Sequence, residues 1–190
     1  MKNIMLSRIL TSTLVVLAMW GIGFGQKANR SVVEVFNNND GTLYPDAYST
    51  LVRTSNGISM TLHAAGLRPG VYTAWWVTEN YPQFCLERPC TLDDEANPAV
   101  QSSVFNATGT VVGADGIGNF GASTMPGAAS SDVLFGPGLL NPLGADVYIV
   151  IRYHGPVIPR QVKEQLTTYE GGCSINECSD DLIAFHISNS

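Results

Sequence analysis

The sequence is poor in charged residues and in histidine, and it lacks the short motifs that mark the common catalytic sites. Charged side chains make up 14% of the 190 residues, and there are 3 histidines. The chain has no G-x-S-x-G elbow, no phosphate-binding loop, no H-E-x-x-H pair and no dinucleotide-binding glycine pattern. With no motif on which an activity can be predicted, the sequence favours a non-catalytic protein.

Helical patterns are also scarce. Only residues 158–172, IPRQVKEQLTTYEGG, repeat apolar side chains near helical spacing, at Val162, Leu166 and Tyr169, with Gly171 able to end a helix. The sequence therefore predicts at most one short helix.

Strand-like alternation covers most of the remaining chain, in about ten short stretches separated by Gly, Pro, Asn and Asp. Residues 58–66 alternate apolar and more polar side chains, and residues 146–154 and 181–188 have the same period. Residues 70–78, GVYTAWWVT, carry bulky side chains on both faces, which indicates a central strand covered on both sides. We expect an all-β fold, an antiparallel Greek-key-like β-sandwich.

The N-terminus has the layout of a secretory signal peptide. Lys2 and Arg8 precede an uncharged, mostly apolar run from Ile9 to Phe24, and cleavage is expected before Gln26. A run of about 16 residues is short for a membrane span of roughly 20, although an uncleaved anchor is the alternative. We expect residues 1–25 to be a signal peptide and residues 26–190 to be a single disulfide-stapled domain, secreted or periplasmic.

The exported part is acidic. Cleavage would remove Lys2 and Arg8 from a chain of 10 basic and 16 acidic residues, which leaves a net charge of −8. Such a domain is not expected to bind nucleic acid or to insert stably in a membrane. The expected partner is an extracellular ligand or a component of the cell surface, and the sequence indicates no oligomeric state.

Four cysteines lie in two segments of equal spacing, CLERPC and CSINEC. In an oxidising compartment an even number of cysteines indicates disulfides, and we favour Cys85 with Cys90 and Cys173 with Cys178 among the three possible pairings. The alternative is a four-thiolate zinc or iron–sulfur site.

Metal binding is a second hypothesis. His63, His154 and His186 fall on the more polar face of an expected strand or at its end, and three imidazoles would suit copper or zinc. The alternative is three unrelated histidines.

The acidic stretches TLDDEANP and SDDL could offer carboxylates to calcium, or could be solvated loops.

Aromatic side chains suggest a third hypothesis, carbohydrate binding. Trp75 and Trp76 must point to opposite sides of a strand, so one is expected in the core. The other either packs against a second sheet or lines a groove with Tyr72, Tyr81 and Phe84. We expect any site where the CLERPC loop meets residues 135–145, FGPGLLNPLGA.

A family resemblance rests on three blocks of this chain, YTAWWVTENYPQFC, LFGPGLLNPLGADVYIVIRYHGP and QLTTYEGGC. In these blocks the chain resembles a group of uncharacterised secreted bacterial β-rich proteins. The resemblance runs from about residue 58 to His186 and implies secretion and a β-rich fold without implying an activity. The stretch LHAAGLRPGVYTAWWV is similar to the strand, turn and strand found in CHRD domains and in copper/zinc superoxide dismutase sandwiches. This second likeness concerns the architecture alone. The dismutase metal site needs two closely spaced histidines, which this sequence lacks.

The sequence thus predicts a secreted, non-catalytic β-sandwich module for extracellular or periplasmic binding or for surface structure. Its alternatives are a copper or zinc protein, which could be redox-active, and a carbohydrate-binding protein with an exposed tryptophan.

Overall fold

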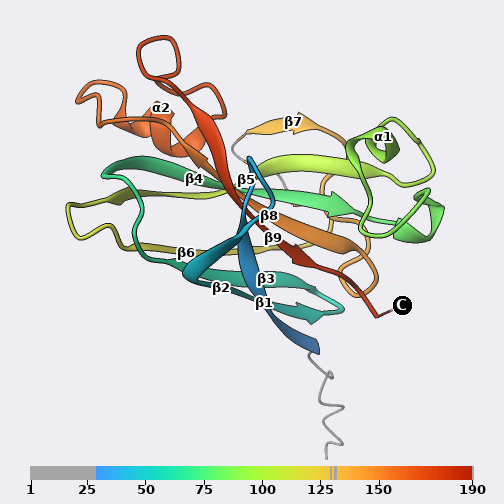
Figure 1. Cartoon of the computed structure of the whole chain (residues 1–190). Helices are drawn as coiled ribbons and strands as arrows, with labels where there is room; N and C mark the ends of the chain where they lie inside the picture. The colour runs from blue at the N-terminus through green and yellow to red at the C-terminus, as the bar shows by residue number, and fades with distance from the viewer. Residues whose placement is uncertain (1–28, 129, 131, 190) are drawn as a thin grey trace, which may run out of the picture.

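A computed structural model describes residues 29–128, 130 and 132–189, and they form one strongly curled antiparallel β-sheet (Figure 1). The expected signal peptide, residues 1–25, lies outside the described residues. The strands follow one another in the order β6-β3-β2-β1-β9-β8-β4-β5-β7, and neighbouring strands are antiparallel. The predicted all-β antiparallel fold is confirmed.

The strands are β1 (Asn29–Asn37), β2 (Leu43–Thr54), β3 (Gly57–Ala64), β4 (Gly70–Glu79), β5 (Ser102–Val112), β6 (Gly118–Thr124), β7 (Val133–Phe135), β8 (Asp146–Tyr153) and β9 (Ser179–His186). Two short helices, α1 (Leu92–Glu95) and α2 (Val162–Thr167), and a 3₁₀ turn (Pro82–Phe84) complete the described elements.

The helices differ from the prediction in one respect. Helix α2 lies within the stretch expected to be helical, whereas α1 is one additional turn in the acidic segment after Cys90. The carboxylate of Asp94 accepts the backbone N–H groups of Thr91 and Leu86, each at 2.8 Å. These bonds satisfy donors around the start of the turn, as a capping box does.

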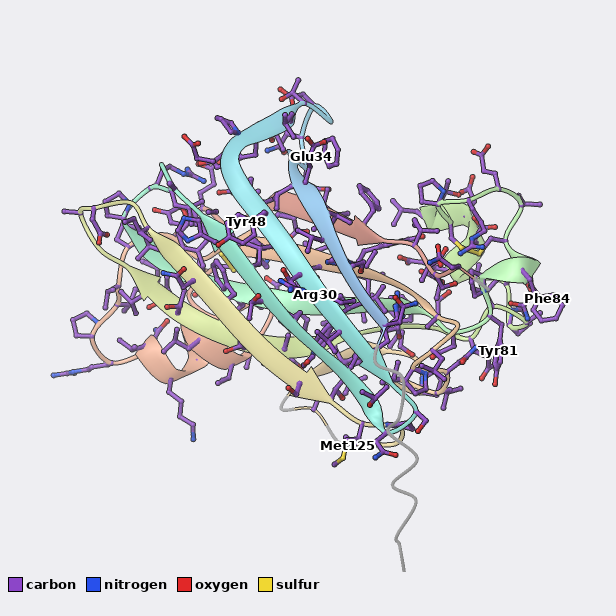
Figure 2. All side chains as sticks on the ribbon, turned by 90° about the horizontal axis from the view of Figure 1, so that it is seen from below. Arg30, Glu34, Tyr48, Tyr81, Phe84 and Met125 are labelled. Atoms are coloured by element: carbon purple, nitrogen blue, oxygen red, sulfur yellow. A yellow bond between two sulfur atoms is a disulfide. The ribbon has the colours of Figure 1, made fainter. Side chains whose placement is uncertain are left out.

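The curled sheet has two halves that face each other across one core. Strands β1, β2, β3 and β6 form one half, whose outer face is seen in Figure 2, and β4, β5, β8 and β9 form the other (Figure 1). The chain crosses between the halves from β3 to β4 and back from β5 to β6. Both halves contribute to a single hydrophobic cluster, including Leu51, Met60, Trp76 and Ile149. The two layers of the expected sandwich are therefore halves of one continuous sheet.

Strand β4 is central, as its sequence predicts, because it pairs with β8 on one side and with β5 on the other. Nine of its ten residues are buried. Helix α2 rests directly against β5, since a Cβ on Gly109 would lie 2.2 Å from the carbonyl oxygen of Leu166. A side chain at this position would push α2 off the outer face of the sheet.

Both disulfides have the pairing favoured by the sequence, Cys85 with Cys90 and Cys173 with Cys178. Each closes a short loop beside a helix, the first before α1 and the second after α2. In the part of the chain that the structure describes, neither helix has the length or the apolar character needed to cross a bilayer.

Candidate ligand-binding groove

The outer face of strands β5, β4, β8 and β9 is apolar where an exposed sheet face is usually polar. Strand pairing aligns its outward side chains in two rows that run across the strands. The first row is Trp75, Val150 and Ile183, and the second is Val104, Val77, Tyr148 and Phe185. Most of these side chains are only partly buried, so they form a floor that still contacts solvent.

A polar or charged row borders the apolar floor at each end. Thr73, Arg152 and Asp180 lie at one end, and Glu79 and Asp146 lie at the other. Because β4 rises about 3.3 Å per residue, the two polar rows are roughly 20 Å apart. The groove therefore offers a short apolar path between two polar ends.

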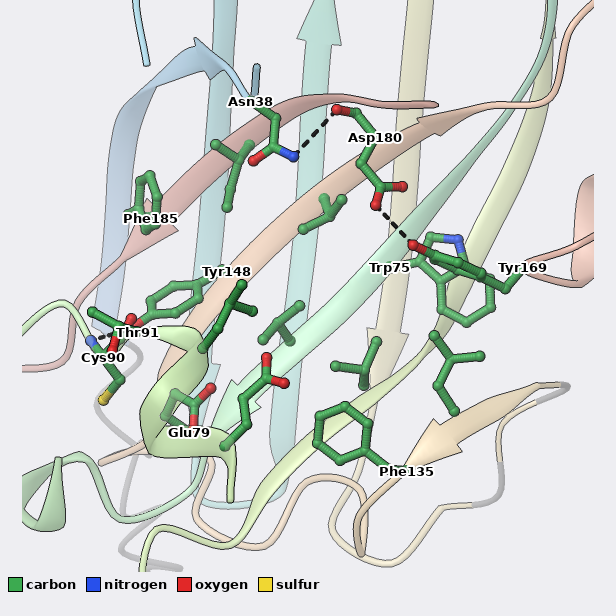
Figure 3. Close-up of a pocket in the computed structure, with 17 residues that line it drawn as sticks. Asn38, Trp75, Glu79, Cys90, Thr91, Phe135, Tyr148, Tyr169, Asp180 and Phe185 are labelled. Carbon is green, nitrogen blue, oxygen red and sulfur yellow. Dashed lines mark hydrogen bonds between the residues drawn. The ribbon is translucent and has the colours of Figure 1, made fainter. Parts of the chain in front are cut away.

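Three segments far apart in sequence form the walls of the groove (Figure 3). Helix α1 contributes Leu92 and Glu95, β7 contributes Phe135, and Tyr169 follows α2. The volume of the groove is about 570 Å³. This falls within the range of roughly 300–1,000 Å³ that is typical of sites for small molecules.

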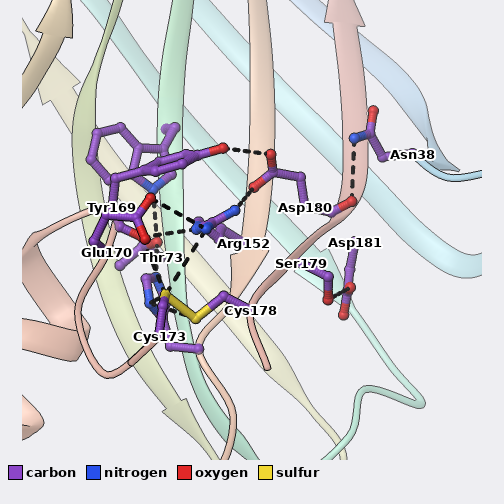
Figure 4. A network of polar contacts seen from close by, with 12 residues as sticks. Asn38, Thr73, Arg152, Tyr169, Glu170, Cys173, Cys178, Ser179, Asp180 and Asp181 are labelled. Carbon is purple, nitrogen blue, oxygen red and sulfur yellow. Dashed lines mark hydrogen bonds and ion pairs between the residues drawn. A yellow bond between two sulfur atoms is a disulfide. The ribbon is translucent and has the colours of Figure 1, made fainter. Parts of the chain in front are cut away.

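A fixed hydrogen-bond chain underlies the Trp75 end (Figure 4 shows part of it). The Nδ1 atom of His154 lies 2.9 Å from the carbonyl oxygen of Gly171, which can only accept, so Nδ1 carries the hydrogen. Burial lowers the pKa of His154 and keeps its ring neutral, which leaves Nε2 to accept the Thr73 hydroxyl at 2.7 Å. That hydroxyl accepts the indole N–H of Trp75, also at 2.7 Å.

Tyr169, which follows α2, forms the wall of the groove at the same end. Its ring meets Trp75 edge-on at 5.2 Å between centroids, and its hydroxyl donates to Asp180 at 2.8 Å. The guanidinium of Arg152 lies 3.7 Å from the Tyr169 ring centroid and pairs with Asp180 at 2.8 Å (Figure 4). Burial, followed by Asp180, raises the pKa of Tyr169 to about 12. Aromatic contacts, hydrogen bonds and an ion pair therefore hold this end of the groove together, and the charges of Arg152 and Asp180 compensate each other.

The opposite end, beside α1, carries a carboxyl group without a cation. Glu79 is 1% exposed, and the hydroxyl of Ser102 donates a hydrogen bond to its carboxyl group. Burial raises the pKa of Glu79 to about 7, the Ser102 bond opposes this shift, and the charges of Glu95, Asp94 and Asp146 add to it. No ion pair within the described residues involves Glu79.

Asp146, in the same row as Glu79, does have a cationic partner. Its carboxylate accepts Nε of Arg88 at 3.0 Å and pairs with the guanidinium a second time through Nη2. It also accepts the backbone N–H of Ser188 at 2.7 Å. The uncompensated acids at this end are therefore Glu79 and Glu95, and burial also raises the pKa of Glu95.

Of the four aromatic residues predicted to bind a ligand, the structure places Trp75 in the groove. Tyr72 and Trp76 lie in the core, because they occupy the other face of β4. Tyr81 follows the end of β4, lies beside Phe84 (Figure 2) and is not among the residues that line the groove. Neither Trp75 nor Trp76 is more than 1% exposed, so neither is the exposed platform that the carbohydrate hypothesis requires.

The three histidines do not form a common site. His63 hydrogen-bonds Asn119 at 2.8 Å, whereas His186 lies between the hydroxyls of Ser31 and Ser49, at 2.8 and 2.9 Å. His186 pairs with the start of β8 and His154 follows its end, which puts them roughly 20 Å apart along the strand. The face of β9 that looked polar is the core face, because Leu182 and Ala184 share it.

His154 nevertheless has sulfur neighbours. Its Nδ1 atom lies 3.9 Å from each sulfur of the Cys173–Cys178 disulfide, and a carboxylate oxygen of Glu79 lies within 4.8 Å of both sulfurs of the Cys85–Cys90 pair. Metal binding by cysteine requires thiolates, and all four sulfurs are joined in disulfides. Either group could hold a soft metal such as copper or zinc only after reduction.

Three of the five carboxylates considered for calcium already accept hydrogen bonds or pair with arginine. Asp94 accepts backbone N–H groups at α1, Asp180 accepts from Arg152 and Tyr169, and Asp181 accepts from Arg68 and Ser179. Calcium would have to displace these donors.

Comparisons of the chain with protein-family models, with curated proteins and with solved structures found no match. The resemblance to secreted β-rich proteins stays a prediction, and function has to be inferred from the groove.

Proposed function

We propose that the protein is a secreted, non-catalytic binding protein that holds a small, largely apolar molecule in the groove between α1 and β7. The observation that carries this proposal is the pair of apolar rows on an outer sheet face, walled on three sides into a volume of about 570 Å³. A face of this kind stays wet and unfavourably hydrated until a ligand covers it.

The rim of the groove supports the same function. Leu92 is 81% exposed, Leu134 is 43% exposed and Phe135 is 37% exposed, and all three line the groove. Covering such surface contributes roughly 25 cal/mol for each Å² removed from water. Polar groups at the two ends of the groove would then orient the ligand.

Export is proposed on two grounds. The N-terminal segment has the composition of a signal peptide, and both cysteine pairs are disulfides, which persist mainly in oxidising compartments.

A direct test is titration with N-phenyl-1-naphthylamine, a neutral apolar dye that fluoresces in dry sites. We expect saturable binding by the full chain purified from an oxidising compartment. Val104→Trp should abolish it, because Val104 lies on the floor of the groove and pairs with Phe135 of the neighbouring strand β7. Val32→Trp is the matched control, since Val32 is 58% exposed on β1 in the other half of the sheet.

Circular dichroism would establish that both variants fold. Absence of dye binding by the unaltered chain, or equal loss in both folded variants, would reject the groove as a binding site and leave a structural role as the better hypothesis.

A further inference from the structure

Among the described residues, the charged side chains that line the groove are all acids. Seventeen described residues line it, and none of these is lysine, arginine or histidine. Three are carboxylic acids, namely Glu79, Glu95 and Asp180. The groove is therefore complementary to a cation and repels an anion.

These acids are not equivalent. Asp180 is already paired with Arg152 and accepts the hydroxyl of Tyr169, so its charge is compensated. Glu79 receives one hydrogen bond from a neutral hydroxyl, and Glu95 stands beside it on α1. An incoming cation gains most at the Glu79 end.

We infer that the ligand is an amine carried on an aromatic or aliphatic body, with its ammonium group held by Glu79 and Glu95 at the α1 end of the groove. The body lies over Val77 and Tyr148 and extends toward Trp75 (Figure 3). This inference rests on the proposed function, because it assigns a ligand class to the same groove.

The length of the apolar path limits the size of the body. Glu79 and Trp75 are four residues apart on β4, which corresponds to about 13 Å. A single ring on a short alkyl chain fits this length, and so does a pair of fused rings. A long acyl chain would extend past Trp75 into the closed row of Arg152 and Asp180.

Protonation couples to binding at this end of the groove. The groups that face Glu79 are Glu95 and Asp94 from α1, together with Asp146, which Arg88 neutralises, and Tyr148 from β8. Since the pKa of Glu79 is about 7 without a ligand, a fraction of the chains is protonated there at neutral pH. An ammonium ion favours the carboxylate, so amine binding near pH 7 should release a proton.

The test compares three ligands that share one body, 4-phenylbutylamine, 4-phenylbutan-1-ol and 4-phenylbutanoate, by isothermal titration calorimetry at pH 8. We expect the amine to bind at least about tenfold more tightly than the alcohol, and the carboxylate to bind most weakly. The preference for the amine should shrink at pH 5.5. Titrations at pH 7 in buffers of different ionisation enthalpy should reveal the released proton.

Two variants test whether the preference for the amine over the alcohol depends on Glu79. Glu79→Gln keeps the shape and should bring amine and alcohol to similar affinity, whereas Glu164→Gln, on the exposed surface of α2, should leave the preference unchanged. If Glu79→Gln does not fold, the pH dependence and proton release of the unaltered chain decide the matter.

The outcomes separate the inference from the proposed function. Equal affinity for all three ligands, or tighter binding of the carboxylate, overturns amine recognition and leaves an apolar binding protein. Absence of binding by all three, together with absence of dye binding, overturns both.

Discussion

Tyr169 meets Trp75 edge-on, with ring centroids 5.2 Å apart and ring planes at 81°. Residues 94 positions apart in sequence thus form one wall of the groove, and Tyr169 is also held by Asp180 and Arg152. The contact closes the groove at its Trp75 end.

Replacing Tyr169 should separate the contributions of its ring and its hydroxyl. Tyr169→Phe loses the bond to Asp180 and should lower the free energy of unfolding by about 1 kcal/mol. Tyr169→Ala also loses both ring contacts and should cost about 2–3 kcal/mol. Urea denaturation measures both values, and tryptophan emission should shift to the red in the alanine variant alone. Equal stability of the two variants would contradict a role for the ring.

The hydroxyl of Thr73 should contribute far more to the free energy of unfolding than the hydroxyl of Thr78, although both residues are fully buried on β4. Thr73→Val leaves the Trp75 indole N–H and the His154 ring without their partner, and we expect a loss of about 2–4 kcal/mol. The Thr78 hydroxyl has no hydrogen-bond partner among the described residues, so Thr78→Val should be neutral or stabilising. Thermal or urea unfolding of the two matched variants checks this order, and a reversed order would contradict the proposed hydrogen-bond chain.

The sequence predicts local features of this fold well. Alternation along residues 70–78 places Trp75 and Trp76 on opposite faces, and the structure has Trp76 in the core and Trp75 in the groove. Equal spacing of the cysteines also predicted the disulfides. Both features depend on neighbours in sequence, where a period of two or a short loop limits the possibilities.

The groove could not be predicted in the same way, because its walls are brought together by tertiary packing. Tyr169 and Phe135 reach β4 from distant segments, and no local pattern reveals that contact. One part of the groove could have been predicted from the sequence. Ile183 and Phe185 make both faces of β9 apolar, which indicates that its outer face is also partly covered. The three histidines failed to converge because the register of β8 and β9 fixes two of them at opposite ends.

The disulfides should have different effects on binding. Each closes a short loop and should contribute about 2 kcal/mol to stability in the chain-entropy model. The Cys85–Cys90 loop precedes α1, so replacing both cysteines by serine should weaken ligand binding by loosening the wall that carries Leu92 and Glu95.

Replacing Cys173 and Cys178 should instead disturb the segment around His154 and Tyr169.

A thiol assay should find no reactive thiol in the native oxidised chain and four after reduction in denaturant, since all four cysteines are paired. Native thiols reactive without a reductant would contradict this pairing.

Two buried groups should oppose each other in the dependence of stability on pH. Burial, followed by the charge of Arg53, lowers the pKa of His186 from 6.5 to about 4. Unfolding frees this ring to take up a proton, so its contribution to stability is lost as pH falls from about 6.5 to 4, by roughly 3 kcal/mol. The lowered pKa of His154 acts in the same direction.

Glu79 acts in the opposite direction. Its pKa of about 7 in the folded chain lies above its ordinary value of 4.5, so its contribution is present at low pH and lost as pH rises from about 4.5 to 7. The stability of the unaltered chain should therefore vary little between pH 4.5 and 6.5. Glu79→Gln should reveal the histidine effect, with stability falling as pH falls. His186→Gln should reduce that effect and expose the opposite slope of Glu79. Urea unfolding at several pH values measures both slopes, and parallel profiles for the two variants would contradict these assignments.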